Sequence, residues 1–263
     1  MTSAITGVIL ADIHGGHLFG LTMPDHQLTP NQAEGSHFRQ KAYDWQRATA
    51  DWFQAEIQRL GPIDIAVSNG DAIEGKGYRS GGTELLTSDR HQQCSIAEAV
   101  IRSTAAPRVL IIRGTPSHTG EEEDWEDTLA DRFGVEAQDH AWLQHGSVVM
   151  DFKHHLGSST VPRTAPPALA RDTVWNLLWS ERDLQPKSNF FVRSHLHEYF
   201  HTGNADFTAL VTPALQGWTK YGAKRMSKTI TYGFVSFRFD EEGFSWKPHI
   251  LVPTFAKAVA ELI

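Results

Sequence analysis

The sequence has little cysteine, no long apolar run and comparatively few basic residues. Cys94 is the one cysteine among 263 residues, so no disulfide can form within the chain. No stretch approaches the ~20 consecutive apolar residues that a membrane-spanning helix needs. The apolar run at residues 5–11 is short and no basic residue precedes it, so we expect no secretory signal. These absences favour a cytoplasmic protein that does not contact membranes.

Acidic residues outnumber basic ones. The chain has 31 Asp and Glu against 24 Lys and Arg, which gives a formal net charge of −7 with histidine neutral. Proteins that bind duplex DNA usually have a basic balance or a basic face, so this charge argues against a polyanionic partner. Histidine, in contrast, occurs 14 times. Because histidine is the commonest side-chain metal ligand, the positions of these residues are the most informative feature of the sequence.

Strands and helices alternate in the first part of the chain, and strands dominate its end. Apolar runs predict strands at residues 5–11, 63–68, 108–113, 148–152 and 189–193, the fourth of them in a hairpin over 135–153. Apolar spacing predicts helices at residues 38–60, 88–104, about 119–133 and 168–182. Further short strands are expected at residues 207–215, 231–239 and 244–251.

The order of these elements predicts the fold class. No repeat or linker is evident, so we expect one domain over residues 1–263, of the α/β class, with a mixed sheet or two packed sheets. Ser88 is the expected N-cap of the second helix. Thr119 and Glu122 have capping-box spacing before the third helix.

Five predicted strands end at or near a side chain that can bind a metal ion. In α/β architectures, sites form outside the carboxyl ends of strands, so these groups can converge although they are far apart in the sequence. Asp and His together suit borderline divalent ions such as Zn, Mn and Fe. Two such ions ~3.5–4 Å apart clamp a phosphoryl group and lower the pKa of a bridging water. The strand-end groups are Asp12/His14, Asp71, the turn Thr115–His118, His154/His155 and His195/His197.

His195 and His197 are two positions apart. In an extended segment, residues i and i+2 point to the same side. These two histidines are therefore expected to serve two ions that lie side by side.

The ordered motifs resemble the calcineurin-like metallophosphoesterases over roughly residues 5–200. The shared pattern is Asp-x-His, Gly-Asp, a Gly-initiated turn, a strand-ending His and His-x-His. The resemblance implies two packed mixed β-sheets flanked by helices, a four-layer αββα sandwich. It also implies a binuclear centre. In this centre the first ion would be bound by Asp12, His14 and His197, both ions by Asp71, and the second ion by His195 with His154 or His155, of which His154 is favoured.

Three of the motifs depart from the family pattern. The family's Gly-Asn-His reads Gly114-Thr115-Pro116-Ser117-His118 here, so Thr115 occupies the position of a liganding Asn. His118 is displaced by two residues and is either a metal ligand or the acid that assists the leaving group. Glu74 stands where the family's second Asp is usual, and Ser194 stands where Gly usually precedes His-x-His.

A second phosphate-binding motif is excluded. Residues 70–76 satisfy the first seven positions of a P-loop, but Gly77 occupies the eighth, where Ser or Thr is needed to hold magnesium. The segment is therefore not expected to bind a nucleotide.

Basic side chains provide candidates for binding a phosphate. Lys220 belongs to a basic run with Lys224, Arg225 and Lys228 that is interleaved with Trp218 and Tyr221. This run is either a solvated face or a phosphate or nucleic-acid contact. Arg163 and Arg193 are the other candidates for grasping a phosphate.

These features predict a two-metal-dependent hydrolase of phosphate esters, with a phosphodiesterase favoured. The nucleophile would be a metal-bridging hydroxide, with Asp71 and His118 as catalytic residues and Mn favoured over Zn, Fe or Ni. A small-molecule phosphate ester is favoured over nucleic acid because of the acidic charge. The alternatives are a DNA nuclease similar to the catalytic subunit of double-strand-break repair complexes and a catalytically weak metal-binding scaffold that recruits a partner. The oligomeric state is left open.

Overall fold

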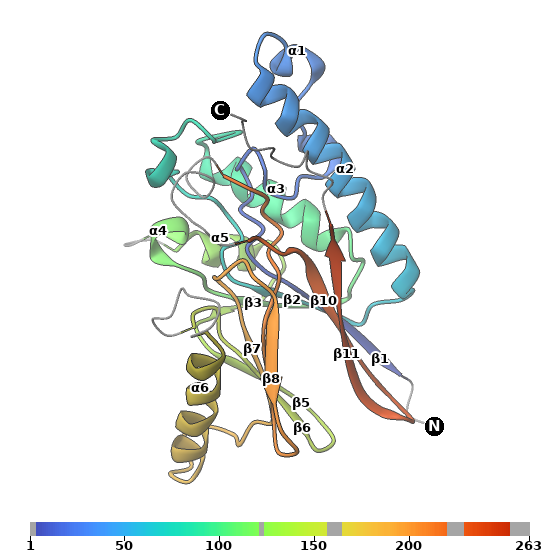
Figure 1. Cartoon of the computed structure of the whole chain (residues 1–263), viewed down its shortest axis with the longest axis vertical. Helices are drawn as coiled ribbons and strands as arrows, with labels where there is room; N and C mark the ends of the chain where they lie inside the picture. Colours follow the sequence, from blue (N-terminus) through green and yellow to red (C-terminus); the bar gives the residue numbers. More distant parts are fainter. Residues whose placement is uncertain (1–3, 121–123, 157–164, 220–228, 253–263) are drawn as a thin grey trace, which may run out of the picture.

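Two mixed β-sheets form the centre of the structure, a computed structural model that describes residues 4–120, 124–156, 165–219 and 229–252 (Figure 1). The first sheet has the order β11 (Gly243–Leu251), β10 (Tyr232–Asp240), β1 (Ile5–Leu10), β2 (Ile65–Asn69), β3 (Arg108–Ile112) and β4 (Ala137–Gln138). The second has the order β5 (Ala141–His145), β6 (Val148–Phe152), β7 (Phe190–Arg193), β9 (Thr208–Val211) and β8 (Phe200–Gly203). Strands β1 to β4 run parallel, as do β6, β7 and β9, and the remaining pairings are antiparallel.

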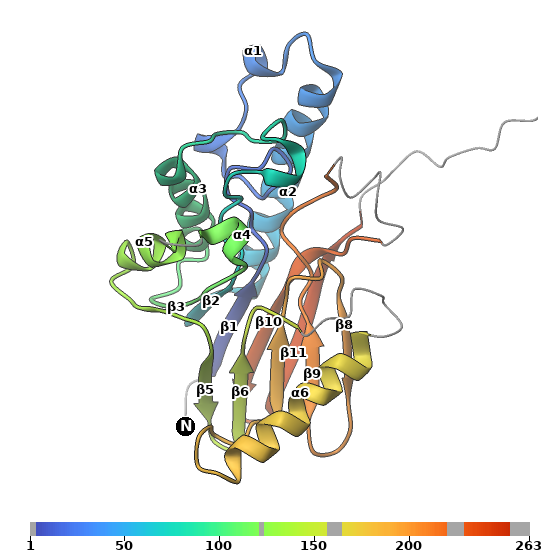
Figure 2. The ribbon, with the colours of Figure 1, turned by 90° about the vertical axis from the view of Figure 1, so that its left-hand side faces the viewer.

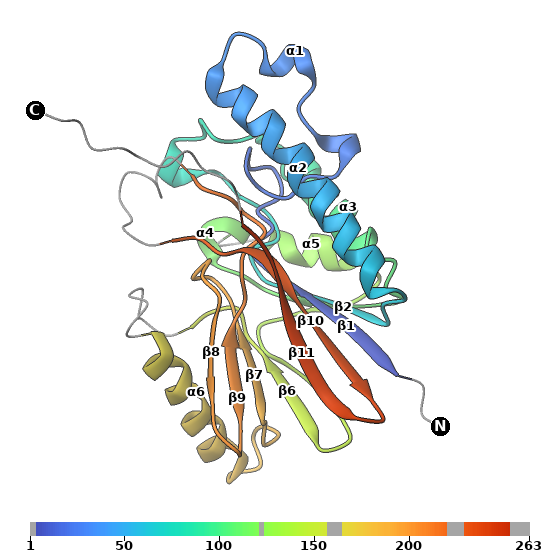
Figure 3. The same ribbon diagram turned by 45° about the vertical axis from the view of Figure 1, so that its right-hand side comes forward.

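Helices cover the outer face of each sheet. The first sheet is covered by α2 (His37–Leu60), α3 (Arg90–Arg102) and α5 (Trp125–Asp131), and the second by α6 (Ala165–Ser180), as Figures 2 and 3 show. The shorter helices are η1 (Pro24–His26), α1 (Pro30–Ala33), η2 (Tyr78–Ser80) and α4 (Pro116–Thr119). The predicted four-layer αββα sandwich of mixed sheets is confirmed.

The alternation of side chains along β1 explains why both of its faces are apolar. Val8 and Leu10 pack with α2 and α3, whereas Ile9 packs between the two sheets with Val67 and Leu210. Successive side chains of a strand point to opposite faces, so a strand with covered faces reads as a continuous apolar run. Each fully buried side chain of this size contributes about 1.5–3 kcal/mol to stability.

Several element boundaries differ from the sequence-based expectations. The N-cap of α3 is Asp89, whose carboxylate accepts the backbone N–H groups of His91 and Gln92, so the assignment of Ser88 was wrong. Thr119 ends α4 instead of capping a helix. Asp124 caps α5, and Glu122 lies outside the described residues.

Two strands were placed wrongly or missed in the sequence. The expected hairpin over 135–153 holds for β5 and β6, but β4 pairs with β3 in the first sheet. The edge strand β8 was not predicted, because it is four residues long and its side chains are half exposed. In the described part of the chain, no helix is long and apolar enough to cross a membrane.

Candidate metal centre

The five predicted metal-binding segments meet where β1, β2, β3, β6 and β7 end, at one edge of the sandwich. Asp12, His14, Asp71, His195 and His197 all have positive φ angles, between 49° and 73°. They are five of the seven non-glycine residues with positive φ in the described ranges. Such backbone conformations cost of order 1–3 kcal/mol each and persist only where the surroundings impose them. The loops are therefore held in conformations that aim these side chains.

The first cluster consists of Asp12, His14 and His197. One potential ligand atom from each lies within 4.8 Å of the others. His197 Nε2 is 3.1 Å from Asp12 Oδ1 and 3.4 Å from His14 Nε2. Asp12 and His14 are fully buried, and the side chain of His197 is 17% exposed.

The second cluster consists of Asp71, His154 and His195. Asp71 Oδ2 is 3.1 Å from His154 Nε2 and 3.8 Å from His195 Nδ1. Asp71 also belongs to a third set of potential ligands, together with His14 and His118, whose atoms lie within 4.8 Å of one another. The Asp71 carboxylate therefore faces both clusters and connects them.

Contacts between Nδ1 and acceptor oxygens leave the Nε2 atoms of three histidines available. His154 Nδ1 lies 2.7 Å from the Asn69 carbonyl oxygen, and His14 Nδ1 lies 2.8 Å from Glu74 Oε2. His118 Nδ1 lies 2.9 Å from the Glu74 carbonyl oxygen. Because these partners accept hydrogen bonds, the neutral form of each ring, which is the form that binds a metal ion, would carry its proton on Nδ1 and its lone pair on Nε2.

The site fits a pair of cations. Asp12 Oδ1 and His154 Nε2 are buried and lie 3.1 Å from His197 Nε2 and Asp71 Oδ2 respectively, in contacts that lack the geometry of a hydrogen bond. Two imidazole Nε2 atoms 3.4 Å apart, in His14 and His197, repel each other when both carry lone pairs. Buried polar atoms are almost always paired, and divalent ions accept lone pairs from carboxylate oxygen and imidazole nitrogen. The donor set therefore suits metal ions.

Neighbouring groups of opposite charge stabilise the ionised forms of the carboxylates in the site. Burial alone would raise the pKa of Asp12, but the neighbouring His197 lowers it to about 2. Burial would likewise lower the pKa of His154, but the Asp71 carboxylate raises it to about 10, and the pKa of Asp71 is held well below its usual value. Burial lowers the pKa of His14. The two carboxylates are thus ionised at neutral pH, as metal ligands must be.

The two packed mixed sheets and the placement of the motifs at the strand ends agree with the expectation drawn from the resemblance to the calcineurin-like metallophosphoesterases. No family model matches the chain, and its sequence matches no curated protein.

Three of the solved structures that are similar to this chain have the following measures of similarity. Vps29 of Entamoeba histolytica complexed with zinc has a TM-score of 0.45 and 12% identity, and the match covers 94% of this chain and 99% of that chain. The Escherichia coli phosphoesterase YfcE has a TM-score of 0.45 and 12% identity, and the match covers 92% of this chain and 91% of that chain. A predicted phosphoesterase of Streptococcus pneumoniae has a TM-score of 0.39 and 10% identity, and the match covers 95% of this chain and 100% of that chain.

Thr115, at the position of the family's liganding Asn, is bonded to Asp71. Its backbone N–H donates to Asp71 Oδ1 at 2.6 Å, and its hydroxyl donates to Asp71 Oδ2 at 3.2 Å. The hydroxyl also lies 3.1 Å from His195 Nδ1. A Cβ on the preceding Gly114 would lie 2.2 Å from the Asp71 backbone nitrogen. A glycine is therefore required for this turn to reach the carboxylate.

The adjacent histidines 154 and 155 differ in position. His154 faces Asp71, whereas His155 belongs to none of the three sets of potential ligands in the described chain. The His155 ring stacks on His195, with centroids 4.3 Å apart. The geometry thus favours His154 as a ligand and gives His155 a packing contact with a neighbouring candidate ligand.

The predicted phosphate-binding residues have separate outcomes. Arg193 is 3% exposed and forms ion pairs with Asp151 at 2.7 Å and Asp172 at 2.8 Å, so its assignment as a phosphate-grasping residue was wrong. Its guanidinium instead ties α6 to the second sheet. Arg163 and Lys220 lie outside the described residues, as does the rest of the basic run from 221 to 228.

The expectation that His195 and His197 lie in an extended segment was wrong. Their φ angles are 73° and 53°, so the segment is not extended. His195 faces Asp71 and His197 faces Asp12 because the backbone turns between them. The two histidines do serve two clusters, but for a different reason from the one that the sequence suggested.

Glu74 and His17 are two buried residues near the site to which the sequence assigned no function. Glu74 is 7% exposed and pairs with His14, and its position as the family's second Asp was the available signal. His17 is 1% exposed, and burial lowers its pKa to about 4. Its Nδ1 accepts the Phe19 backbone N–H at 3.0 Å, and the lowered pKa keeps the ring neutral at pH 7.

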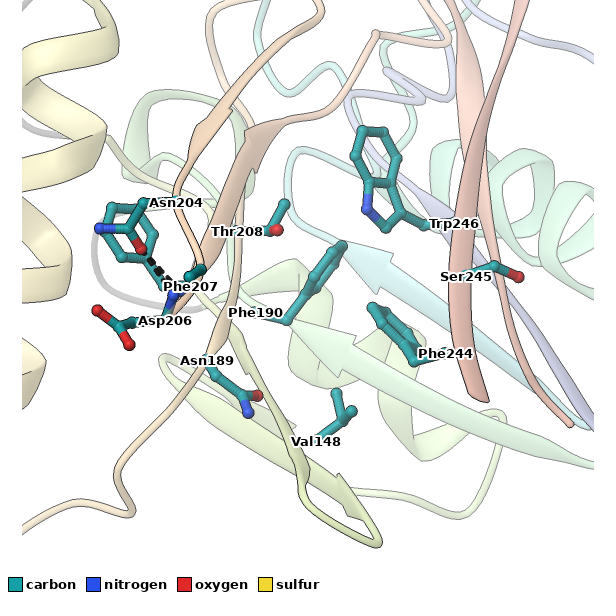
Figure 4. A pocket seen from close by; sticks show the side chains of 11 residues that line it. Val148, Asn189, Phe190, Asn204, Asp206, Phe207, Thr208, Phe244, Ser245 and Trp246 are labelled. Carbon is teal, nitrogen blue, oxygen red and sulfur yellow. Dashed lines mark hydrogen bonds between the residues drawn. The ribbon is translucent and has the colours of Figure 1, made fainter. Parts of the chain in front are cut away.

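A separate cavity of about 440 Å³ lies at the other end of the sandwich (Figure 4). It is formed where β6, β7 and β9 begin, whereas the metal-binding groups lie where strands end. Phe190, Phe244 and Trp246 point into it. None of the candidate ligands lines this cavity, so it is not part of the metal centre.

Proposed function

We propose that this protein is a two-metal-dependent phosphoesterase that acts on small-molecule phosphodiesters. The observation that carries the proposal is the pair of ligand clusters, Asp12–His14–His197 and Asp71–His154–His195, joined at the Asp71 carboxylate. In this proposal Asp71 would be a ligand of both ions. Manganese is the favoured metal, with zinc, iron and nickel as alternatives.

The exposed side of the centre defines where a substrate enters. The side chains of His195, His118 and His197 are 28%, 22% and 17% exposed, whereas those of Asp71, His14 and His154 are at most 2% exposed. A phosphoryl group would therefore approach from the side of the three partly exposed histidines. The buried carboxylates and histidines would hold the ions from behind.

Metal ions supply most of the chemistry in such a centre, because two bound cations offset charge on a phosphoryl group and lower the pKa of a nearby water. The protein fixes the geometry. Asp71 is positioned by two hydrogen bonds from Thr115, and His14 by Glu74. Rigid placement of this kind lowers the barrier, because little reorganisation is needed in the transition state.

His118 is the proposed proton donor to the leaving oxygen. Its Nδ1 is fixed on the Glu74 carbonyl oxygen, so Nε2 is the atom left to carry the transferred proton. The alternative role, as a metal ligand, rests on its closeness to His14 and Asp71. His118→Ala distinguishes the two. A proton donor can be lost with the metal content unchanged, whereas loss of a ligand lowers the number of ions bound per chain.

Hydrolysis of bis(p-nitrophenyl) phosphate and p-nitrophenyl phosphate tests the function. Metal-stripped protein is assayed after single additions of Mn, Zn, Fe, Ni or Mg. Asp71→Asn is compared with Asp51→Asn, a control at an exposed position on α2. We expect diester turnover that a transition metal restores, that Asp71→Asn abolishes and that Asp51→Asn retains. Turnover of the monoester alone would replace the proposal with a phosphatase.

Thr115 favours a second candidate function, a metal-binding scaffold. A hydroxyl is a poorer metal ligand than an amide oxygen, and the Thr115 hydroxyl is bonded to Asp71. Two ions bound per chain without turnover of any diester, monoester or single-stranded DNA would favour this candidate. Turnover restricted to DNA would instead support the nuclease alternative.

A further inference from the structure

Helix α6 has an inner face that packs on the second sheet. Leu169 and Ala168 pack against Phe191, Ala209 and Val211. Asp172 accepts a hydrogen bond from Arg193, and Asn176 bonds to Ser188 and Pro186. Because this face already satisfies the contacts of α6 with its own chain, the apolar residues elsewhere on the helix need another explanation.

Helix α6 and the turn that follows it carry most of the exposed large hydrophobic side chains in the described chain. Of nine large hydrophobic side chains that are exposed there, six lie between residues 174 and 184. Val174 and Trp175 are each 55% exposed, and Leu178 is 49% exposed. No other described helix covers this face (Figures 2 and 3). Concentrated apolar surface of this kind marks an interaction site, and a helix that is apolar all round is normally buried.

The outer face also has the spacing of a helix-pairing seam. Arg171, Val174, Leu178 and Glu181 follow one another at intervals of three, four and three residues, as the a and d positions of a coiled coil do. Glu181 continues the helical path, since its backbone N–H donates to the Leu177 carbonyl oxygen at 3.1 Å. The seam therefore has an apolar centre, a cation at one end and an anion at the other.

We propose that α6 pairs with α6 of a second copy of this chain, antiparallel, about a two-fold axis near Asn176. This register places Val174 opposite Leu178 of the second copy and Arg171 opposite Glu181 of the second copy. Arg171 and Glu181 are exposed and take part in no ion pair within the described residues. A two-fold interface repeats each contact twice, so one apolar pair and one charge pair on this helix become two of each.

Charge decides between a second copy and a lipid surface. Helices that lie on anionic membranes carry Lys and Arg around the apolar face. The seam instead ends in charges of opposite sign, and Arg182 and Asp183 add one more of each. These balanced charges give no net attraction to an anionic surface. In an antiparallel pair, however, the basic end of one seam faces the acidic end of the other.

The test is the mass of the full chain in solution by analytical ultracentrifugation at micromolar concentrations. The wild type is expected to sediment as a dimer. Leu178→Glu places two like charges at the centre of the seam and should weaken dimerisation by at least about thirty-fold, the effect of losing a hot-spot residue. Leu184→Glu is the matched control, because Leu184 is 64% exposed but lies beyond the seam. Far-UV circular dichroism and metal content should be unchanged in both variants.

A charge exchange tests the register. Arg171→Glu and Glu181→Arg should each weaken the dimer about five-fold, and the double variant should recover the wild-type affinity, because exposed ion pairs contribute up to about 1 kcal/mol. A wild type that stays monomeric overturns the proposal, whether or not it binds vesicles of anionic lipid. A dimer that Leu178→Glu leaves intact overturns it as well, and failure of the double variant to recover overturns the antiparallel register.

Discussion

Glu74 Oε2 lies 2.8 Å from His14 Nδ1, on the side of the ring away from Nε2, the candidate ligand atom. Both groups are buried, and the pairing lowers the pKa of Glu74 to about 2 in spite of burial, which acts in the opposite direction. A carboxylate in this position fixes the ring and increases its basicity. The relationship makes Glu74 a positioning residue for the first proposed ion.

Replacing Glu74 tests that role. Glu74→Ala should weaken binding of the first ion by about 10–100-fold, the usual effect of removing such a partner. Glu74→Gln keeps an acceptor for His14 and should lose less. Calorimetric titration of metal-stripped protein measures both, with Glu34→Gln as an exposed control. Equal affinities in Glu74→Ala and wild type would show that His14 needs no such support.

Gly70 leaves space for His154. A Cβ at this position would lie 2.3 Å from His154 Nδ1, and the φ of Gly70 is +87°. Gly70→Ala should therefore displace the ring and reduce the metal content from two ions to one per chain, measured by elemental analysis. Gly61→Ala is the control, because Gly61 also has a positive φ of +75° but nothing lies within 4 Å of its Cβ. Loss of an ion in both variants would attribute the effect to backbone strain.

The hydrogen bond from the Thr115 hydroxyl to Asp71 is expected to contribute to metal affinity. Thr115→Val removes a hydrogen bond to a buried carboxylate, and such bonds contribute about 1.5–3 kcal/mol. We expect metal affinity at the second cluster to fall at least about ten-fold by the same measure. Thr115→Asn restores the amide oxygen of the family pattern and should raise kcat for diester hydrolysis. A fall in kcat with Thr115→Asn would contradict the family-based assignment of this position.

His17 makes stability depend on pH. Burial lowers its pKa to about 4 in the folded state, against 6.5 when unfolded. The unfolded chain therefore binds more protons between these values, and the contribution of the neutral ring, about 3 kcal/mol, is complete above pH 6.5 and lost as the pH falls towards 4. Glu74, His14, His118 and His197 also act on this ring.

Chemical denaturation of metal-stripped protein at pH 7 and at pH 4.5 measures this dependence. His17→Gln should lose less stability between the two pH values than wild type, whereas the exposed control His37→Gln should behave as wild type. A loss in His17→Gln as large as in wild type would assign the pH dependence to the other histidines of the site.

Arg193 connects Asp151 and Asp172 in the interior. Arg193→Ala removes the guanidinium from the Asp151 carboxylate, which is 1% exposed and keeps only His140 at 2.9 Å and the Trp142 indole N–H at 3.0 Å among its side-chain contacts in the described residues. The variant should cost about 3 kcal/mol of unfolding free energy, the lower end of the range for breaking a buried ion pair. Arg238→Ala removes an exposed ion pair with Asp240 that has the same 2.8 Å length as the Arg193–Asp172 pair. This control should cost less than about 1 kcal/mol. Similar costs for the two variants in urea denaturation would contradict the difference in burial.

The sequence by itself determined the fold class and most of the candidate ligands. Short apolar runs such as residues 5–11 favour strands that are covered on both faces, and polar groups that follow neighbouring parallel strands are expected at one edge of a sheet. Asp12, Asp71 and His197 could be found in this way. Local signals of this kind depend on residue type and spacing, and both are present in the chain before it folds.

Only the tertiary structure decided which neighbouring side chains contact each candidate ligand. His154 faces Asp71 while His155 stacks on His195, and Arg193 turns into the interior to meet Asp151. These outcomes depend on backbone angles in loops and on partners far away in the sequence. The apolar residues on the outer face of α6 could likewise be assigned to the core from the sequence. Residue spacing shows that a helix has an apolar face, but it does not show whether the rest of the chain covers that face.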